Sequence, residues 1–118
     1  MLFIEYPKCS TCQKARKWLD EHEISYVDRH IKEESPTADE LKAWVGASGI
    51  EIKKLFNTSG LLYKSMSLKE RLPSMTDEEK FDLLATDGML VKRPLIVNGN
   101  TVLTGFRENE WKKHFNIE

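Results

Sequence analysis

The sequence predicts an α/β protein built on a mixed four-stranded sheet with helices on both faces. Three observations predict it. A strand–helix–strand pattern occupies residues 1–29, a helical block without strand signal occupies about 33–91, and a hairpin followed by a helix occupies 95–115. We expect one domain over residues 1–118, because a chain of this length suits a single buried core.

The first unit starts with an apolar and aromatic strand at residues 1–6. Residues 13–22 follow with helical periodicity, and residues 24–29 alternate partially, as a second strand does. Two strands joined by one helix lie parallel through a right-handed crossover. The inward helix face is predicted to carry Cys12, Ala15, Trp18, Leu19 and His22.

The central block begins its helices with two capping boxes. Thr37-Ala-Asp-Glu40 and Thr76-Asp-Glu-Glu79 each place a threonine three residues before a glutamate, the pattern of a helix N-terminus. The first helix is predicted to end near Gly49 and the second at Asp87-Gly88.

In the last unit, the hydrophobic periodicity changes from that of helices to that of strands. Residues 95–97 and 101–104 flank Asn98-Gly99, a strong signal for an antiparallel hairpin. Gly105 ends the sheet, and residues 108–115 form a closing helix that buries Trp111 and Phe115. The order of elements is that of the thioredoxin/glutaredoxin fold, with a helical insertion between its βαβ and ββα halves.

Cys9 and Cys12, the only cysteines, lie between the first strand and the first helix. Unpaired N–H groups and the helix dipole stabilise an anion at a helix start, so a Cys-x-x-Cys there can have a low thiol pKa. The neighbouring Lys8 adds positive charge. We therefore predict that Cys9 is an exposed nucleophile and that Cys12, one turn further in, resolves its adducts as a disulfide.

Other interpretations of the two cysteines are less favoured. A structural disulfide is disfavoured because closing so short a loop removes little entropy from the unfolded chain. A zinc site is disfavoured because no second Cys-x-x-Cys exists and the three histidines lack ligand spacing. Inert core thiols remain an alternative. The sequence predicts neither a metal nor an organic cofactor.

The composition argues against several classes of protein function. A net charge of −1 and a pI near 6.3 argue against direct nucleic-acid binding. No apolar run approaches the roughly 18 residues that span a bilayer, so no membrane association is expected. Because both cysteines lie in one motif, a reducing cytoplasm is the expected compartment.

A second part of the site is predicted at Arg93-Pro94, directly before the third strand. Pro94 either starts an edge strand or forms a cis peptide that brings backbone polar groups beside Cys9. Arg93 is either a solvated loop residue or a fixed guanidinium that binds an oxyanion near the thiolate. Arg107 could reach the same edge or open the last helix at the surface. For Asn57 and Ser59, an ordinary turn role competes with a place in the cleft.

Several motifs together resemble the arsenate-reductase-like (ArsC) family, over essentially the whole chain. They are Pro7-x-Cys9-Ser10-Thr11-Cys12, Lys14-Ala15-Arg16, Trp18-Leu19, the stretch 55–60, Asp87-Gly88 and Lys92-Arg93-Pro94-Leu95-Ile96. The Cys-x-x-Cys and the length are most similar to the Spx/YusI-like branch.

The resemblance implies a thioredoxin fold with a helical insertion and a cis-proline after an active-site arginine. It implies that the Cys9 thiolate attacks an oxyanion and that Arg93 corresponds to the active-site arginine. Lys8, Ser10, Thr11, Asn57, Pro94 and Arg107 are then the expected substrate-binding residues. Asn57 stands where the family's reductases have a further arginine.

The resemblance also implies two kinds of partner. An enzyme of this family implies a small oxyanion or disulfide substrate and a thioredoxin-type or glutaredoxin/glutathione reductant. The Spx relatives are redox-sensing transcription regulators that bind the C-terminal domain of the RNA polymerase α subunit. Gly49 lies near the glycine of their polymerase-contact region.

Overall fold

A computed structural model describes residues 1–118 and contains one sheet of four strands. They are β1 (Leu2–Glu5), β2 (Val27–His30), β3 (Leu95–Asn98) and β4 (Thr101–Thr104), in the order β2-β1-β3-β4. β1 is parallel to β2 and antiparallel to β3, and β3 is antiparallel to β4. The predicted mixed α/β fold is therefore confirmed.

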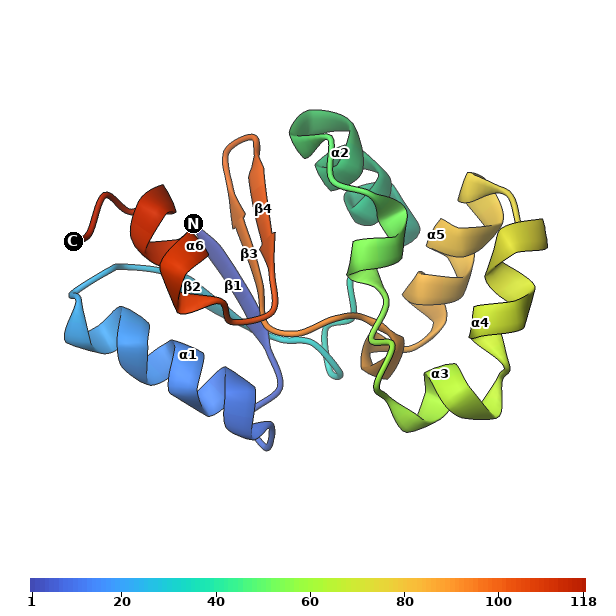
Figure 1. Ribbon diagram of the computed structural model, residues 1–118, viewed down its shortest axis with the longest axis horizontal. Coiled ribbons are helices and arrows are strands. Elements are labelled where there is room, and N and C mark those ends of the chain that lie inside the picture. The colour runs from blue at the N-terminus through green and yellow to red at the C-terminus, as the bar shows by residue number, and fades with distance from the viewer.

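One face of the sheet is covered by α1 (Ser10–Glu21) and α6 (Glu108–His114), which lie together in Figure 1. Successive strand residues point to opposite faces, so Phe3 and Ile96 meet these helices while Ile4 and Leu95 point away. The hydrophobic cluster on this face consists of Phe3, Ala15, Trp18, Leu19, Ile96 and Trp111.

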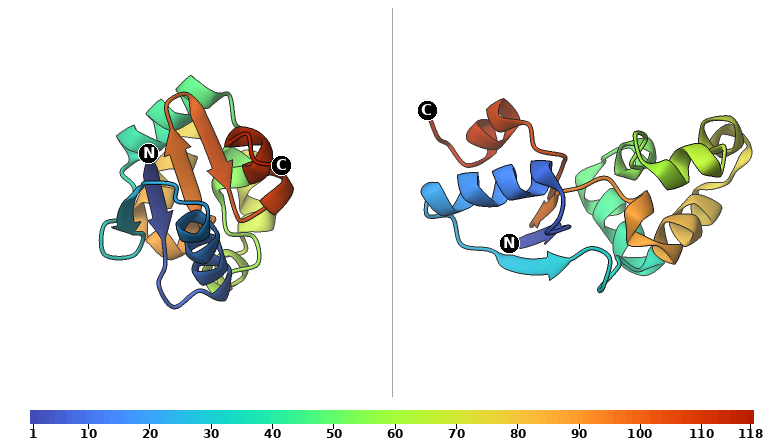
Figure 2. Two further views of the ribbon diagram at one scale, coloured as in Figure 1. Left: turned by 90° about the vertical axis from the view of Figure 1, so that its left-hand side faces the viewer. Right: turned by 90° about the horizontal axis from the view of Figure 1, so that it is seen from below.

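The opposite side holds the inserted block, which Figures 1 and 2 show as a separate group of helices beside the sheet. Its core includes Ile4 and Leu95 from the sheet. In order, the insertion consists of α2 (Ala38–Ser48), the 3-10 turn η1 (Ile52–Leu55), α3 (Leu61–Ser65), α4 (Leu68–Arg71), η2 (Leu72–Ser74), α5 (Asp77–Thr86) and η3 (Gly88–Leu90).

Both predicted capping boxes are present. The hydroxyl of Thr37 accepts from the N–H of Glu40, and the Glu40 carboxylate accepts from the N–H of Thr37; Thr76 and Glu79 do the same for α5. Gly49 ends α2 with a φ of 74°, a left-handed conformation that glycine adopts without steric cost. Local sequence therefore sets these boundaries.

Two backbone hydrogen bonds join the middle of the insertion to its C-terminal end. The N–H of Asn57 donates to the carbonyl of Leu90 at 2.8 Å, and that of Lys92 donates to Leu55 at 2.7 Å. Gly88 packs so closely on the end of β2 that a Cβ there would lie 2.0 Å from the Ile31 carbonyl oxygen. The middle of the insertion is thus tied to its C-terminal end, and that end packs on the segment that follows β2.

Three predicted details were wrong. β2 begins at Val27 rather than residue 24, because the Ile24 N–H still closes the helix end on the Leu19 carbonyl and pairing with β1 starts with the Val27 N–H. His22 is exposed at the end of α1 instead of facing inward, with its ring stacked against Trp18. The hairpin turn lies one residue later, at Gly99 and Asn100, since Asn98 pairs with Thr101.

The last helix also differs slightly from expectation. Trp111 is fully buried as predicted, but Phe115 caps the helix end and is only half-buried. None of the helices combines the length and apolar character needed to cross a bilayer.

Candidate active site

Cys9 occupies the N-cap position of α1, with extended backbone angles (φ −84°, ψ 124°). A turn that links the Cys9 N–H to the Tyr6 carbonyl at 2.9 Å sets this position directly after β1. Its thiol makes no side-chain capping hydrogen bond of ordinary geometry. The N–H groups of Thr11 and Cys12 nevertheless lie close enough to act on it. The predicted placement of Cys9 at the helix start is confirmed.

The environment favours the thiolate of Cys9. Burial is the largest single influence and opposes ionisation. Burial is outweighed by four favourable influences: the Cys12 N–H, the Cys12 thiol, the Thr11 N–H and the charge of Arg93. The pKa of Cys9 therefore lies below its ordinary value. The side chain is half-buried and therefore within reach of a substrate.

Cys12 has the opposite character. It is fully buried on the inner face of α1, and burial is the main reason that its pKa is raised to about 12. The two cysteines lie 3.5 Å apart and both are free. One thiol is thus accessible and ionisable, and its neighbour is protected and protonated.

Cys9 opens into a cleft of about 480 Å³ between the start of α1, the insertion and the segment after β4. No acidic side chain lines it. The lining residues are Cys9, Thr11, Asn57, Ser59, Gly60, Leu61, Lys92, Arg93, Gly105, Phe106 and Arg107.

Arg93 is fixed beside the thiol. It precedes a cis peptide bond to Pro94, as predicted, and its guanidinium carbon lies 5.6 Å from the centre of the Tyr6 ring. Its Nε and Nη1 atoms are buried and have no hydrogen-bond partner in the protein. A guanidinium with free buried donors is suited to bind an anion.

Asn57 is almost fully buried and lines the cleft rather than forming an ordinary exposed turn. Its Oδ1 accepts from the Ser59 hydroxyl at 3.4 Å, and its side-chain amide would collide with any Cβ at Gly60. The glycine therefore lets the amide pack against the loop. The structure places both Asn57 and Ser59 in the cleft.

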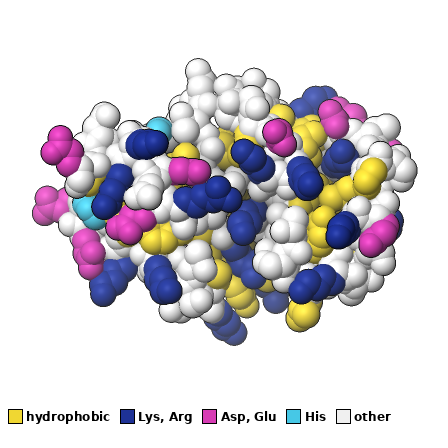
Figure 3. Space-filling model, in the orientation of Figure 1, with side chains coloured by type: hydrophobic (Ala, Val, Ile, Leu, Met, Phe, Trp, Pro, Cys, Tyr) yellow, Lys and Arg dark blue, Asp and Glu magenta, His cyan; other side chains and the backbone are white.

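Two further cations complete the cleft. Lys92 precedes Arg93, and Arg107 is the exposed N-cap of α6, where it pairs loosely with Glu110 at 3.5 Å. Figure 3 shows lysine and arginine side chains gathered across the middle of this face, between the sheet and the insertion. Lys92 was not predicted as a site residue, although its position next to Arg93 in the sequence could have indicated it.

Three expected residues do not line the cleft. Lys8 and Ser10 are exposed on the turn and first helical position, and Pro94 is buried behind Arg93 with its carbonyl accepting from the Gly105 N–H at 2.8 Å. The main influences on the pKa of Cys9 do not include Lys8. The residues that line the cleft around Cys9 are thus fewer than the motif suggested.

Sequence reasoning missed a carboxylate behind the cysteines. Glu5, the last residue of β1, is only 1% exposed, and its carboxylate pairs with Arg16, which also bonds Asp28 at 2.9 Å. A glutamate two residues after Phe3, on the same inward face of a buried strand, was the available signal. No group of three His, Cys, Asp or Glu side chains is placed to hold a metal ion.

Comparison with known proteins identifies the family. The model of the ArsC family matches residues 4–114. The chain belongs to the ArsC family. The uncharacterised protein YusI of Bacillus subtilis is 47% identical over 98% of both chains, and the regulatory protein MgsR of the same species is 30% identical over 96% of this chain and 88% of its own.

Solved structures of ArsC relatives agree with the fold described above. An ArsC-family-related protein from Bacteroides fragilis superposes with a TM-score of 0.90 at 56% identity, covering 95% of this chain and 94% of the other. A possible arsenate reductase from Streptococcus mutans gives 0.85 at 41% identity, covering 94% and 96%. The resemblance inferred from the sequence motifs is therefore confirmed, and the proteins that this chain resembles include a possible arsenate reductase and a regulatory protein.

Proposed function

We propose that this ArsC-family protein is a thiol-dependent oxidoreductase that uses Cys9 as nucleophile and Cys12 as resolving thiol. The observation that carries the proposal is the pairing of a half-buried thiol of lowered pKa with a fully buried thiol 3.5 Å away. A nucleophilic thiol must be both ionised and accessible, whereas a resolving thiol needs only to reach the first sulfur.

With a disulfide substrate, the Cys9 thiolate attacks one sulfur, a Cys9–substrate bond forms, and the first substrate thiolate leaves. Cys12 then attacks the Cys9 sulfur, the mixed disulfide breaks, and the second substrate thiolate leaves. The protein ends as a Cys9–Cys12 disulfide, having given two electrons to the substrate. A thioredoxin-type or glutaredoxin-type partner in a reducing cytoplasm restores both thiols.

With an oxyanion such as arsenate, the same two steps apply. Cys9 displaces one oxygen as water and forms a sulfur–arsenic bond. Attack by Cys12 on the Cys9 sulfur then breaks that bond and leaves the electron pair on arsenic, which departs as arsenite. The likeness to a possible arsenate reductase at 41% identity supports this substrate class.

The charge of the cleft favours an anionic substrate of either type. Lys92, Arg93 and Arg107 line it and no acidic side chain does, and Arg93 has two buried nitrogens free to donate. These cations stabilise the charge that develops on the leaving group, and their effect is largest where water is partly excluded.

The decisive assay offers the purified protein arsenate and an anionic disulfide, each with thioredoxin-based and with glutaredoxin-based recycling. We expect turnover that depends on Cys9 and disappears in Cys9→Ser. An alkylation profile that gives Cys9 an ordinary thiol pKa, together with no turnover in any combination, would refute the proposal.

A second candidate function is a redox-sensing transcription regulator that contacts the C-terminal domain of the RNA polymerase α subunit. The 30% identity to the regulatory protein MgsR over nearly the whole chain supports it. Here the Cys9–Cys12 pair acts as the switch. A pull-down with the isolated α-subunit domain tests this: binding that differs between reduced and oxidised protein supports a regulator, and no binding in either state excludes it.

A further inference from the structure

The proposed reaction needs a proton acceptor for Cys12. Its thiol is fully buried, so bulk water has no access to the proton that must leave before this sulfur can attack. Burial is also the main reason that its pKa is raised to about 12, against the opposing effect of the Tyr6 N–H. An acceptor inside the protein is therefore required for fast resolution at neutral pH.

Glu5 lies in the right place for this task. Alternation along β1 points Phe3 and Glu5 to the face that α1 covers, and Glu5 directly precedes Tyr6, whose N–H acts on the Cys12 thiol. The charges of Cys9 and Glu5 both act on that thiol.

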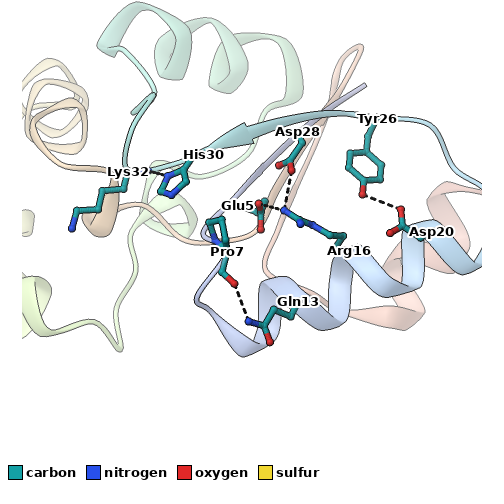
Figure 4. A network of polar contacts seen from close by, with 9 residues as sticks. All are labelled: Glu5, Pro7, Gln13, Arg16, Asp20, Tyr26, Asp28, His30 and Lys32. Atoms are coloured by element: carbon teal, nitrogen blue, oxygen red, sulfur yellow. Dashed lines mark hydrogen bonds and ion pairs between the residues drawn. The ribbon is translucent and has the colours of Figure 1, made fainter.

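The Glu5 carboxylate has one oxygen held and one oxygen free. Figure 4 shows Arg16 of α1 reaching both Glu5 and Asp28 of β2. The Arg16 guanidinium pairs with Oε1 of Glu5, whereas Oε2 is buried and has no hydrogen-bond partner. An unpaired buried carboxylate oxygen is costly, so its presence calls for a role.

On the basis of the proposed function, we propose that Glu5 is the general base that accepts the Cys12 proton while Cys12 attacks the Cys9–substrate bond. The S–H bond of Cys12 breaks, its electron pair forms the Cys9–Cys12 bond, and the Cys9–substrate bond breaks with its pair leaving on the substrate. The proton stays on Glu5 until a reductant opens the disulfide and Cys12 takes it back.

The surroundings of Glu5 fit this cycle. Burial and the charge of Asp28 raise the pKa of Glu5, and Arg16 opposes them, so Glu5 is a stronger base than an exposed carboxylate. Two of the influences that hold the proton on Cys12 come from Cys9, by hydrogen bond and by charge. Both are lost once Cys9 is bonded to substrate, so the proton is released more easily at the step that requires it.

The test uses dithiobis(nitrobenzoate), an anionic disulfide whose coloured thiolate reports both steps. Attack by Cys9 releases the first equivalent, and resolution by Cys12 releases the second. We expect Glu5→Gln to keep the first release within about twofold of the wild type and to slow the second about tenfold or more at neutral pH.

Asp28→Asn is the matched control, because it also removes a carboxylate from Arg16 but keeps the carboxylate of Glu5. It should leave the first phase nearly unchanged and slow the second phase far less than Glu5→Gln does, because it lowers the pKa of Glu5 without removing the proton acceptor. Glu5→Asp should regain part of the lost rate, which a purely structural role would not predict.

The outcomes separate the two proposals. Wild-type protein that releases no first equivalent contradicts the oxidoreductase function itself. If the wild type shows two phases and Glu5→Gln leaves the rate of the second phase unchanged, only the role of Glu5 is overturned. If Glu5→Gln does not fold, the pH dependence of the wild type decides. The rate of the second release must then fall on acidification with the titration of a single carboxyl group, separate from the titration of Cys9. A rate profile without that carboxyl titration rejects the inference.

Discussion

The guanidinium of Arg93 lies over the ring of Tyr6, with its central carbon 5.6 Å from the ring centre. An aromatic face attracts a cation, so this contact holds the arginine at one wall of the cleft, where its charge acts on the Cys9 thiolate. Tyr6 and Cys9 belong to the same turn, which links their positions through the Cys9 N–H bond to the Tyr6 carbonyl.

Removing that charge should make Cys9 less reactive. Arg93→Ala is expected to raise the pKa of Cys9 and to slow its alkylation by iodoacetamide at neutral pH roughly two- to tenfold. The measurement is the alkylation rate against pH. Arg93→Lys is the control that keeps the charge and should retain most of the rate; equal rates in wild type and Arg93→Ala would show that the helix start alone stabilises the thiolate.

A trapping experiment should distinguish the roles of the two cysteines. Cys12→Ser is expected to accumulate a stable adduct between Cys9 and a disulfide substrate, because no second thiol is available to resolve it. Cys9→Ser should form no adduct at all, since the buried Cys12 is protonated at neutral pH. Intact-mass spectrometry distinguishes these species, and adducts on Cys12 in Cys9→Ser would reverse the assigned roles.

The close packing of Gly88 on Ile31 predicts a large loss of stability in Gly88→Ala. A Cβ at this position would lie 2.0 Å from a backbone carbonyl oxygen, which only a shift of the main chain can relieve. We expect the free energy of unfolding to fall by about 3 kcal/mol or more.

Gly46→Ala provides the matched control for that substitution. Gly46 is exposed within α2, and the Cβ that alanine would add there has no atom within 4 Å, so the substitution should raise the free energy of unfolding by about 0.5–1 kcal/mol. Urea denaturation of both variants checks the pair. Similar effects of the two substitutions would contradict the close approach of Gly88 to Ile31.

An ion pair at the start of the insertion should make stability depend on pH. The Arg29 guanidinium donates to both oxygens of Glu40, at 2.7 and 2.9 Å, and this bond, against the opposing effect of burial, lowers the pKa of Glu40 to about 2. A carboxyl with a lowered pKa stabilises the fold above its unfolded pKa of about 4.3, and the contribution is lost as pH falls toward 2.

Glu40→Gln is therefore expected to destabilise the protein at pH 7 by roughly 1–2 kcal/mol, after allowance for solvent screening of a partly exposed pair. The difference from wild type should shrink on acidification and vanish near pH 2. Denaturant unfolding across this range measures it, and a difference independent of pH would mean that the charge of Glu40 does not account for the effect.

Local patterns were sufficient to predict most of the fold. The capping boxes at Thr37 and Thr76 define helix starts through contacts only three residues apart, and alternation predicted the strands on both sides of the hairpin. The start of β2 was not predictable in the same way. It depends on where the Val27 N–H meets the carbonyl of Met1, a contact between distant parts of the chain.

The same distinction applies to the site. The position of Cys9 follows from the strand–helix junction, and that of Arg93 from its proline and the family motifs. Asn57 and Lys92 reach the cleft only because the middle of the insertion pairs with its C-terminal end, through the bonds of Asn57 to Leu90 and of Lys92 to Leu55. No local pattern encodes that pairing.

The split of the hydrophobic interior into two clusters has a consequence for how the cleft can vary. Cys9 lies at the start of α1, which packs on one hydrophobic cluster. Asn57, Ser59 and Leu61 belong to the insertion, whose apolar side chains pack on the other face of the sheet. Exchanging the insertion for that of a relative would replace one wall of the cleft while leaving the thiol, its helix and Glu5 in their original setting. Substrate preference and sulfur reactivity can therefore diverge independently within this architecture.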